Sequence, residues 1–160
     1  MTRAWRWLGL ALLLAVLAGC ATPRRAEAPP GVQVWSGRLA LNVDGAQPFS
    51  AGFELKGEPA TGELTLFNPL GGTAGVLTWA PGSATLRTGR ETRQFDSLEA
   101  LAKEVTGTPL PIAALFDWLQ GRATDVPGWQ VDVSQVAQGR LRAQRTAPPP
   151  AADLRVAFER

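Results

Sequence analysis

The sequence contains no histidine and no tyrosine, and its single cysteine is Cys20. Histidine and cysteine are the usual zinc ligands and the usual bases or nucleophiles of catalytic triads, so both kinds of site are effectively excluded. One cysteine cannot form an internal disulfide, and stability must therefore come from a packed core. The glycine-rich stretch at 71–75 leads into a predicted strand, whereas a phosphate-binding P-loop leads into a helix. We therefore predict no metal and no cofactor.

Acidic side chains are the remaining candidates for catalysis, because a pair of carboxylates can hydrolyse a glycosidic bond. Each of them lies where strand alternation, helix capping or a turn already explains an acidic residue. We therefore predict no catalytic residue and expect that the protein is not an enzyme. The residues considered are Glu54, Glu58, Glu63, Asp96, Glu99 and Asp117.

The first 20 residues have the pattern of a lipoprotein signal. Two arginines precede an apolar run at 8–18, which is much shorter than the ~20 residues that a membrane-spanning helix needs. The run ends in "LAGC" at 17–20, which resembles the lipobox of bacterial lipoproteins, where the cysteine thiol takes diacylglycerol. An ordinary cleavage site followed by a cysteine is the alternative. We predict a signal peptide at 1–19 and lipid attachment at Cys20.

Cleavage before Cys20 would remove two of the 16 basic residues and leave 14 against 14 acidic ones. A formally neutral chain argues against nucleic acid as the partner. Residues 20–31 are rich in alanine and proline and lack apolar periodicity, so they predict a flexible tether that reaches on the order of 35 Å. Lipoproteins of this kind that stay in the inner membrane usually carry aspartate after the cysteine. Ala21 therefore implies the outer membrane, with the chain anchored by lipid on the periplasmic side.

Residues 32–160 are enough for one domain, and most of them alternate between apolar and polar side chains. A period of two is typical of antiparallel strands with one buried face. The predicted strands are 35–43, 49–56, 63–67, 74–80, 83–88, 90–95, 129–134, 140–144 and 153–159.

The apolar period lengthens at two places in the middle of the domain. Asp96, followed three residues later by Glu99, predicts a capped helix that ends at Gly107. A second helix is predicted from Pro111 to Gly121. These elements predict a mainly β protein with α-helices, in which two helices lie over the concave face of a strongly curved antiparallel sheet. A flat sheet with helices on one face would bury the same residues and stays open as the alternative.

Two features of the sequence allow more than one interpretation. The six tryptophans and six phenylalanines either fill the core or line a cavity. The segment "FNPLGGT" at 67–73 predicts a turn with Leu70 pointing at water. Single exposed leucines are common and need no function, so Leu70 is either an ordinary surface residue or a functional one.

Three segments, in this order, resemble the LolB family of outer-membrane lipoprotein receptors: "WSGRLAL" at 35–41, "FNPLGGTAGVLTW" at 67–79 and "SLEALAKEVTGTPLPIAALFDWLQG" at 97–121. The resemblance implies an unclosed antiparallel β-barrel lidded by helices. Its apolar interior would accept the acyl chains of a lipoprotein from a LolA-like periplasmic carrier and pass the cargo to outer-membrane lipid. It implies neither a nucleotide nor a covalent step. A structural or lipid-sensing envelope lipoprotein without transfer activity is the alternative function.

The resemblance also implies functional residues. The protruding apolar loop residue of the family, important for delivery to the membrane, falls on Leu70, which Pro69 and Gly71 flank. We expect the protein to act as a monomer. Inward residues of the strands and of the facing helix are the candidates for the wall of the acyl cavity: Leu39, Leu41, Phe53, Leu55, Leu64, Leu66, Trp79, Leu115 and Trp118.

Overall fold

The computed structural model describes residues 32–159. The predicted signal peptide, Cys20 and the tether lie outside these residues. Nine strands form one antiparallel sheet in the order β6-β5-β4-β3-β2-β1-β9-β8-β7. The bounds are β1 Gln33–Val43, β2 Phe49–Gly57, β3 Gly62–Phe67, β4 Thr73–Ala80, β5 Ser83–Thr88, β6 Glu91–Phe95, β7 Trp129–Asp132, β8 Arg140–Arg145 and β9 Ala152–Glu159.

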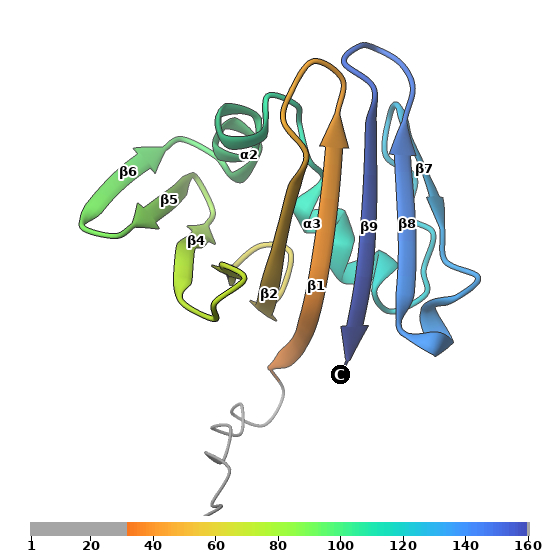
Figure 1. Ribbon diagram of the computed structural model, residues 1–160, viewed down its shortest axis with the longest axis horizontal. Helices are drawn as coiled ribbons and strands as arrows, with labels where there is room; N and C mark the ends of the chain where they lie inside the picture. Colours follow the sequence, from red (N-terminus) through yellow and green to blue (C-terminus); the bar gives the residue numbers. More distant parts are fainter. Residues whose placement is uncertain (1–31, 160) are drawn as a thin grey trace, which may run out of the picture.

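The sheet is strongly curved and does not close. Strands β6 and β7 are the two ends of the sheet order and do not pair with each other. Helices α2 (Leu98–Thr106) and α3 (Ile112–Trp118) lie on one side of the sheet, and Figure 1 shows α3 behind β1 and β9. The prediction of an unclosed antiparallel barrel with helices over its concave face is confirmed.

Helix α2 begins one residue later than the sequence pattern predicts. Its N-cap is Ser97, whose hydroxyl oxygen accepts a hydrogen bond of 3.1 Å from the backbone N–H of Ala100. The prediction of Asp96 as the cap was wrong, because Ser97 has the extended conformation of a cap and its oxygen reaches the free N–H. The predicted end is confirmed, since Gly107 adopts the left-handed conformation that closes the helix.

Helix α3 is shorter than predicted and ends at Trp118, with Leu119 as its C-cap. The chain then tightens into a turn, where the Gly121 N–H donates to the Trp118 carbonyl over 2.9 Å. Pro111 is the N-cap and not the first helical residue. The strand predicted at 129–134 is also shorter, because the Asp132 carboxylate accepts the Ser134 N–H in a turn that ends β7.

Strand β1 lies at the centre of the sheet between β2 and β9. Gly37 in this strand permits the close approach of β9, since a Cβ atom there would lie 2.0 Å from the Ala157 carbonyl oxygen. A buried bond ties β8 to the segment between the helices: the Arg145 guanidinium donates to the Thr108 hydroxyl. The sheet thus fixes the position of the segment that joins α2 to α3.

Aromatic side chains fill the core beneath α3. The Phe116 ring lies 5.6 Å from the Trp35 ring and 6.1 Å from the Trp79 ring, in edge-on geometry. On the other side of the helix, Trp118 packs at 6.4 Å against Trp129. All five side chains are buried, so the aromatic residues of α3 hold the helix onto the sheet.

Candidate functional site

An apolar cavity of about 450 Å³ lies between the concave face of the sheet and the two helices. Apolar side chains of five strands form its floor, and α2, α3 and the segment between them form its roof. The residues that line it are Leu39, Leu41, Val43, Ala46, Gln47, Phe49, Leu64, Leu66, Leu77, Ala102, Val105, Thr106, Gly107, Leu110, Pro111, Ile112, Leu115 and Leu154. Among the lining residues, only Gln47 and Thr106 have polar side chains. Because the rest of the lining is apolar, the cavity suits a hydrocarbon chain.

The exposed part of the lining marks the mouth of the cavity. Phe49 at the start of β2 is 42% exposed and Val105 near the end of α2 is 45% exposed, although both are large apolar side chains. The loop between β1 and β2 adds Ala46 and Gln47. Figure 1 shows α2 beside this loop, at the same end of the sheet. An apolar ligand entering here would touch apolar side chains before it leaves water completely.

Val105 lies on the apolar face of α2 but is not buried. The apolar side chains of α2 follow helical spacing and are those of Leu98, Leu101, Ala102 and Val105; the first three are buried. Val105 lies one turn beyond Leu101, near the end of the helix, and borders the mouth of the cavity. Leu98 and Leu101 therefore pack in the core, whereas Ala102 and Val105 line the cavity.

Five of the nine predicted cavity residues line this cavity: Leu39, Leu41, Leu64, Leu66 and Leu115. The other four, Phe53, Leu55, Trp79 and Trp118, lie outside its lining and are at most 5% exposed. These four share the inward face of their elements with the lining residues. They differ in position along the elements, since the filled part of the core lies next to the cavity on the same face of the sheet.

Hydrogen bonds explain why the two predicted tryptophans lie in the filled part. The Trp79 indole N–H donates to the Pro59 carbonyl over 3.1 Å, and the Trp118 indole N–H donates to the Thr124 carbonyl over 2.9 Å. A buried indole N–H without such a partner would cost free energy. Both rings are thereby held toward the backbone segments that satisfy them.

Asp117 holds the segment that follows α3. Its carboxylate accepts a 2.6 Å hydrogen bond from the Thr124 hydroxyl and is ion-paired with Arg122. The hydrogen bond from Thr124, followed by that from Arg122, lowers the pKa of Asp117 below its ordinary value of 3.8. Because the Thr124 carbonyl also accepts the hydrogen bond of the Trp118 indole, this carboxylate secures the end of α3 that lies in the filled core.

The turn between β3 and β4 presents Leu70 to solvent. Leu70 is 97% exposed, so the prediction that it points at water is confirmed. Gly71 has a φ of 84°, which a residue with a side chain rarely adopts. The turn contributes no residue to the cavity lining, so Leu70 belongs to a separate surface.

Asn68 fixes this turn, and the sequence analysis did not identify it. Its side-chain oxygen accepts hydrogen bonds from the N–H groups of Leu70 at 3.0 Å and Gly72 at 2.9 Å. Its backbone N–H donates to the Gly72 carbonyl over 2.8 Å. Asparagine before proline is a recognised turn signal, which could have drawn attention to this residue.

Two other kinds of site were sought within residues 32–159. This part of the chain has no cluster of three or more residues that could hold a metal ion. Neither of its helices has the length and hydropathy of a membrane span. The apolar cavity and the Leu70 turn are therefore the features on which a functional interpretation rests.

The sequence comparisons agree with one another. The family model for the outer membrane lipoprotein LolB matches residues 34–154. The outer-membrane lipoprotein LolB of Bordetella bronchiseptica is 40% identical over 128 residues, which cover 74% of this chain and 64% of that protein. The protein of the same name from Bordetella petrii is 34% identical and covers 91% of this chain and 88% of its own length. That from Chromobacterium violaceum is 35% identical, with 90% and 79% covered.

The match to the Bordetella bronchiseptica protein thus spans slightly less than two thirds of that relative, whereas the match to the Bordetella petrii protein spans most of it. The matched segment of the family model contains all of β1 except Gln33, together with both helices and the Leu70 turn. It also contains every residue that lines the cavity. The chain belongs to the LolB family of outer-membrane lipoproteins.

Proposed function

We propose that this protein is an outer-membrane acceptor that takes lipoproteins from a LolA-like periplasmic carrier and inserts them into outer-membrane lipid. The observation that carries the proposal is the apolar cavity with its mouth between Phe49 and Val105. The acyl chains of the cargo would lie in this cavity, and no covalent step is required. The protein would act as a monomer, anchored through lipid on Cys20.

The size of the cavity sets how much acyl chain it can hold. If each methylene needs the ~30 Å³ that a water molecule takes in the liquid, about 450 Å³ holds on the order of 15 methylenes. Burial of each methylene is worth ~0.8 kcal/mol, so one such chain gains on the order of 12 kcal/mol relative to water. The cavity therefore suits about one acyl chain, and further chains would require movement of the roof formed by α2 and α3.

Release follows from the same energetics. A bilayer buries the whole chain, whereas the cavity leaves part of it at a mouth lined by half-exposed side chains. Cargo then moves to the membrane without nucleotide hydrolysis, provided that the mouth comes close to lipid. Leu70 supplies that contact in our proposal, because burial of one leucine in lipid is worth ~1.5–3 kcal/mol. Pro69, Gly71 and Asn68 hold it away from the protein surface.

Transfer of a labelled lipoprotein from the carrier to liposomes tests the proposal. We expect the wild-type protein to remove cargo from the carrier and to deliver it to the vesicles. A protein that binds a fluorescent fatty acid but removes no cargo from the carrier would be a lipid sensor, the alternative function. A protein that does neither would contradict the assignment of the cavity.

A further inference from the structure

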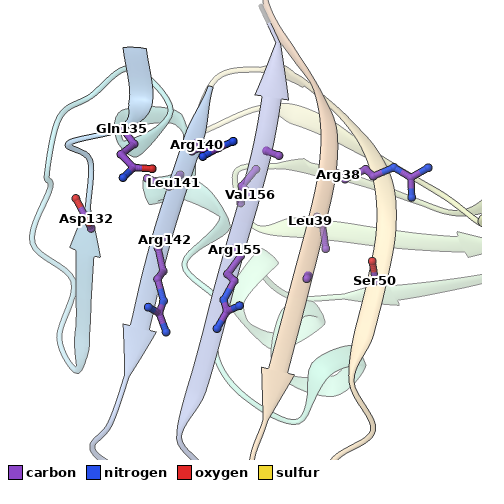
Figure 2. Close-up of a pocket in the computed structure, with 12 residues that line it drawn as sticks. Arg38, Leu39, Ser50, Asp132, Gln135, Arg140, Leu141, Arg142, Arg155 and Val156 are labelled. Atoms are coloured by element: carbon purple, nitrogen blue, oxygen red, sulfur yellow. The ribbon is translucent and has the colours of Figure 1, made fainter. Parts of the chain in front are cut away.

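Four arginines surround a hollow on the outer face of the sheet, opposite the helices (Figure 2). Arg38 belongs to β1, Arg155 to β9, and Arg140 and Arg142 to β8. The hollow has a volume of about 480 Å³ and extends over Ser50 of β2. We propose that this hollow, called here the arginine groove, binds the phosphate groups of anionic phospholipids at the membrane surface. The proposal rests on the membrane-facing role proposed for Leu70.

Strand register builds the groove in two rows. In the first row, Ala157 of β9 lies directly between Arg38 of β1 and Arg140 of β8. Neighbouring strands are ~4.8 Å apart, so the two arginine Cα atoms are separated by about 10 Å. Only the methyl side chain of Ala157 lies between them. A small residue between two long cations leaves room for a bulky anion such as a phosphate.

The second row has a similar arrangement. Ala40 of β1 lies opposite Arg155 of β9, which in turn lies opposite Arg142 of β8. Like charges directly opposite each other on a sheet are destabilising unless something neutralises them. Asp153 does so here, accepting hydrogen bonds from Arg142 at 3.0 Å and from Arg155 at 2.8 Å.

The first row lacks such a carboxylate. Among residues 32–159, no ion pair is formed by Arg38 or Arg140. Asp153 pairs with both arginines of the second row, and Asp132 lies near Arg142. Glu159 lies on the same face of β9, two residues beyond Ala157, and forms no ion pair with Arg38 or Arg140. Arg38 and Arg140 lie on either side of Ala157 without an ion-paired carboxylate, and exposed guanidinium groups of this kind can turn toward a ligand with negatively charged oxygens.

The position of the Leu70 turn favours a lipid surface as the source of that ligand. Arg38 and Ser50 also line a second hollow, together with Asn68, Pro69 and Gly71 of the turn. In Figure 2 the Arg38 side chain extends over β2, away from the other arginines. The groove is therefore continuous with the base of the turn. A leucine that enters the hydrocarbon layer would bring the adjoining arginines to the level of the headgroup phosphates.

The test uses the full-length protein, purified from membranes and reconstituted into vesicles of phosphatidylcholine with or without phosphatidylglycerol. A fluorophore on Gln144→Cys, an exposed position of β8 two residues beyond Arg142 on the same face, reports contact with a headgroup quencher. We expect quenching in the anionic vesicles. In the double variant Arg38→Gln/Arg140→Gln, the ratio of membrane-facing to free molecules should fall roughly fivefold for each arginine and roughly 25-fold for the pair.

Arg87→Gln/Arg90→Gln is the matched control, because it removes the same charge from exposed arginines outside the groove. We expect this control to behave as wild type. Thermal unfolding of Arg38→Gln/Arg140→Gln should match wild type, since neither arginine has an acidic partner to lose. Equal quenching in the groove variant and in wild type would overturn the proposal.

Three further results separate this proposal from its rivals. Binding of inorganic phosphate alone, as tight as the contact with anionic vesicles, would assign the groove to a soluble anion and overturn the proposal. A groove variant that contacts vesicles normally but accepts no cargo from the carrier would assign it to an acidic protein. Failure of Leu70→Glu to change cargo delivery would instead contradict the proposed delivery step, while the charge dependence of quenching would still support the groove.

Discussion

Leu115 and Trp118 lie three residues apart on α3 and should respond in opposite ways to the same substitution. Leu115 lines the cavity and is half-buried, whereas Trp118 is 0% exposed within the filled core. We expect Leu115→Glu to keep the fold and lose acyl binding, because its carboxylate can stay hydrated while the cavity is empty. We expect Trp118→Glu to unfold the domain.

The structure gives the magnitudes. In Leu115→Glu an acyl chain loses a leucine contact worth ~1.5–3 kcal/mol, so its affinity falls roughly 10- to 150-fold before any cost of desolvating the carboxylate. Removal of a buried tryptophan costs about 3–5 kcal/mol, and burial of an unpaired charge adds several more. The sum is comparable with the ~5–15 kcal/mol that stabilises a domain.

Titration of a fluorescent fatty acid and urea unfolding measure the two effects separately. Leu115→Met is the control for substitution at the site itself, since exchange of leucine for methionine usually costs less than about 1.5 kcal/mol. It should retain both stability and binding. The reasoning would be refuted if Leu115→Glu bound fatty acid as wild type does, or if Trp118→Glu stayed folded and lost only binding.

Three further predictions concern the anchor, the segment after α3 and the turn. Cys20→Ala should leave the protein folded but no longer attached to the outer membrane, which fractionation after a high-salt wash measures; retention in the membrane would contradict the predicted anchor. Asp117→Asn should cost about 0.5–1 kcal/mol at pH 7. Because the pKa of Asp117 is lowered in the folded state, its contribution is present above pH 3.8 and disappears as the pH falls through the folded pKa, so urea unfolding of wild type and Asp117→Asn should converge in acid. Asn68→Ala should lower delivery to vesicles at a stability cost below about 1 kcal/mol, whereas Asn68→Asp keeps the acceptor oxygen and should deliver normally; equal delivery by both variants would show that the turn needs no fixed shape.

Alternation of apolar and polar side chains was sufficient to predict the strands. In β9, Leu154, Val156 and Phe158 are all buried as the period of two requires, and the exposure of Leu70 followed from the turn residues around it. The ends of the helices were predicted less accurately than the strands. Asp96 and Ser97 are both good caps, and only the backbone conformation decides between them.

The site could be predicted only in part, because periodicity assigns a side chain to a face and not to a place along it. Leu64 and Phe53 both point inward, yet the first lines the cavity and the second lies in the filled core. The register in which the strands pair could not be predicted from the sequence either. The alignment of Arg38, Ala157 and Arg140 depends on pairing between residues more than 100 positions apart in the chain.

The central claim is that the cavity accepts cargo and Leu70 delivers it, as two separable steps. Transfer of a labelled lipoprotein from a LolA-like carrier to liposomes, scored on carrier, acceptor and vesicles separately, tests this claim most directly. We expect cargo to stay on the carrier with Leu115→Glu and to accumulate on the acceptor with Leu70→Glu. Leu70 is exposed, so its substitution should change stability by no more than about 0.5 kcal/mol. Equal delivery to the vesicles by Leu70→Glu and wild type would contradict the account.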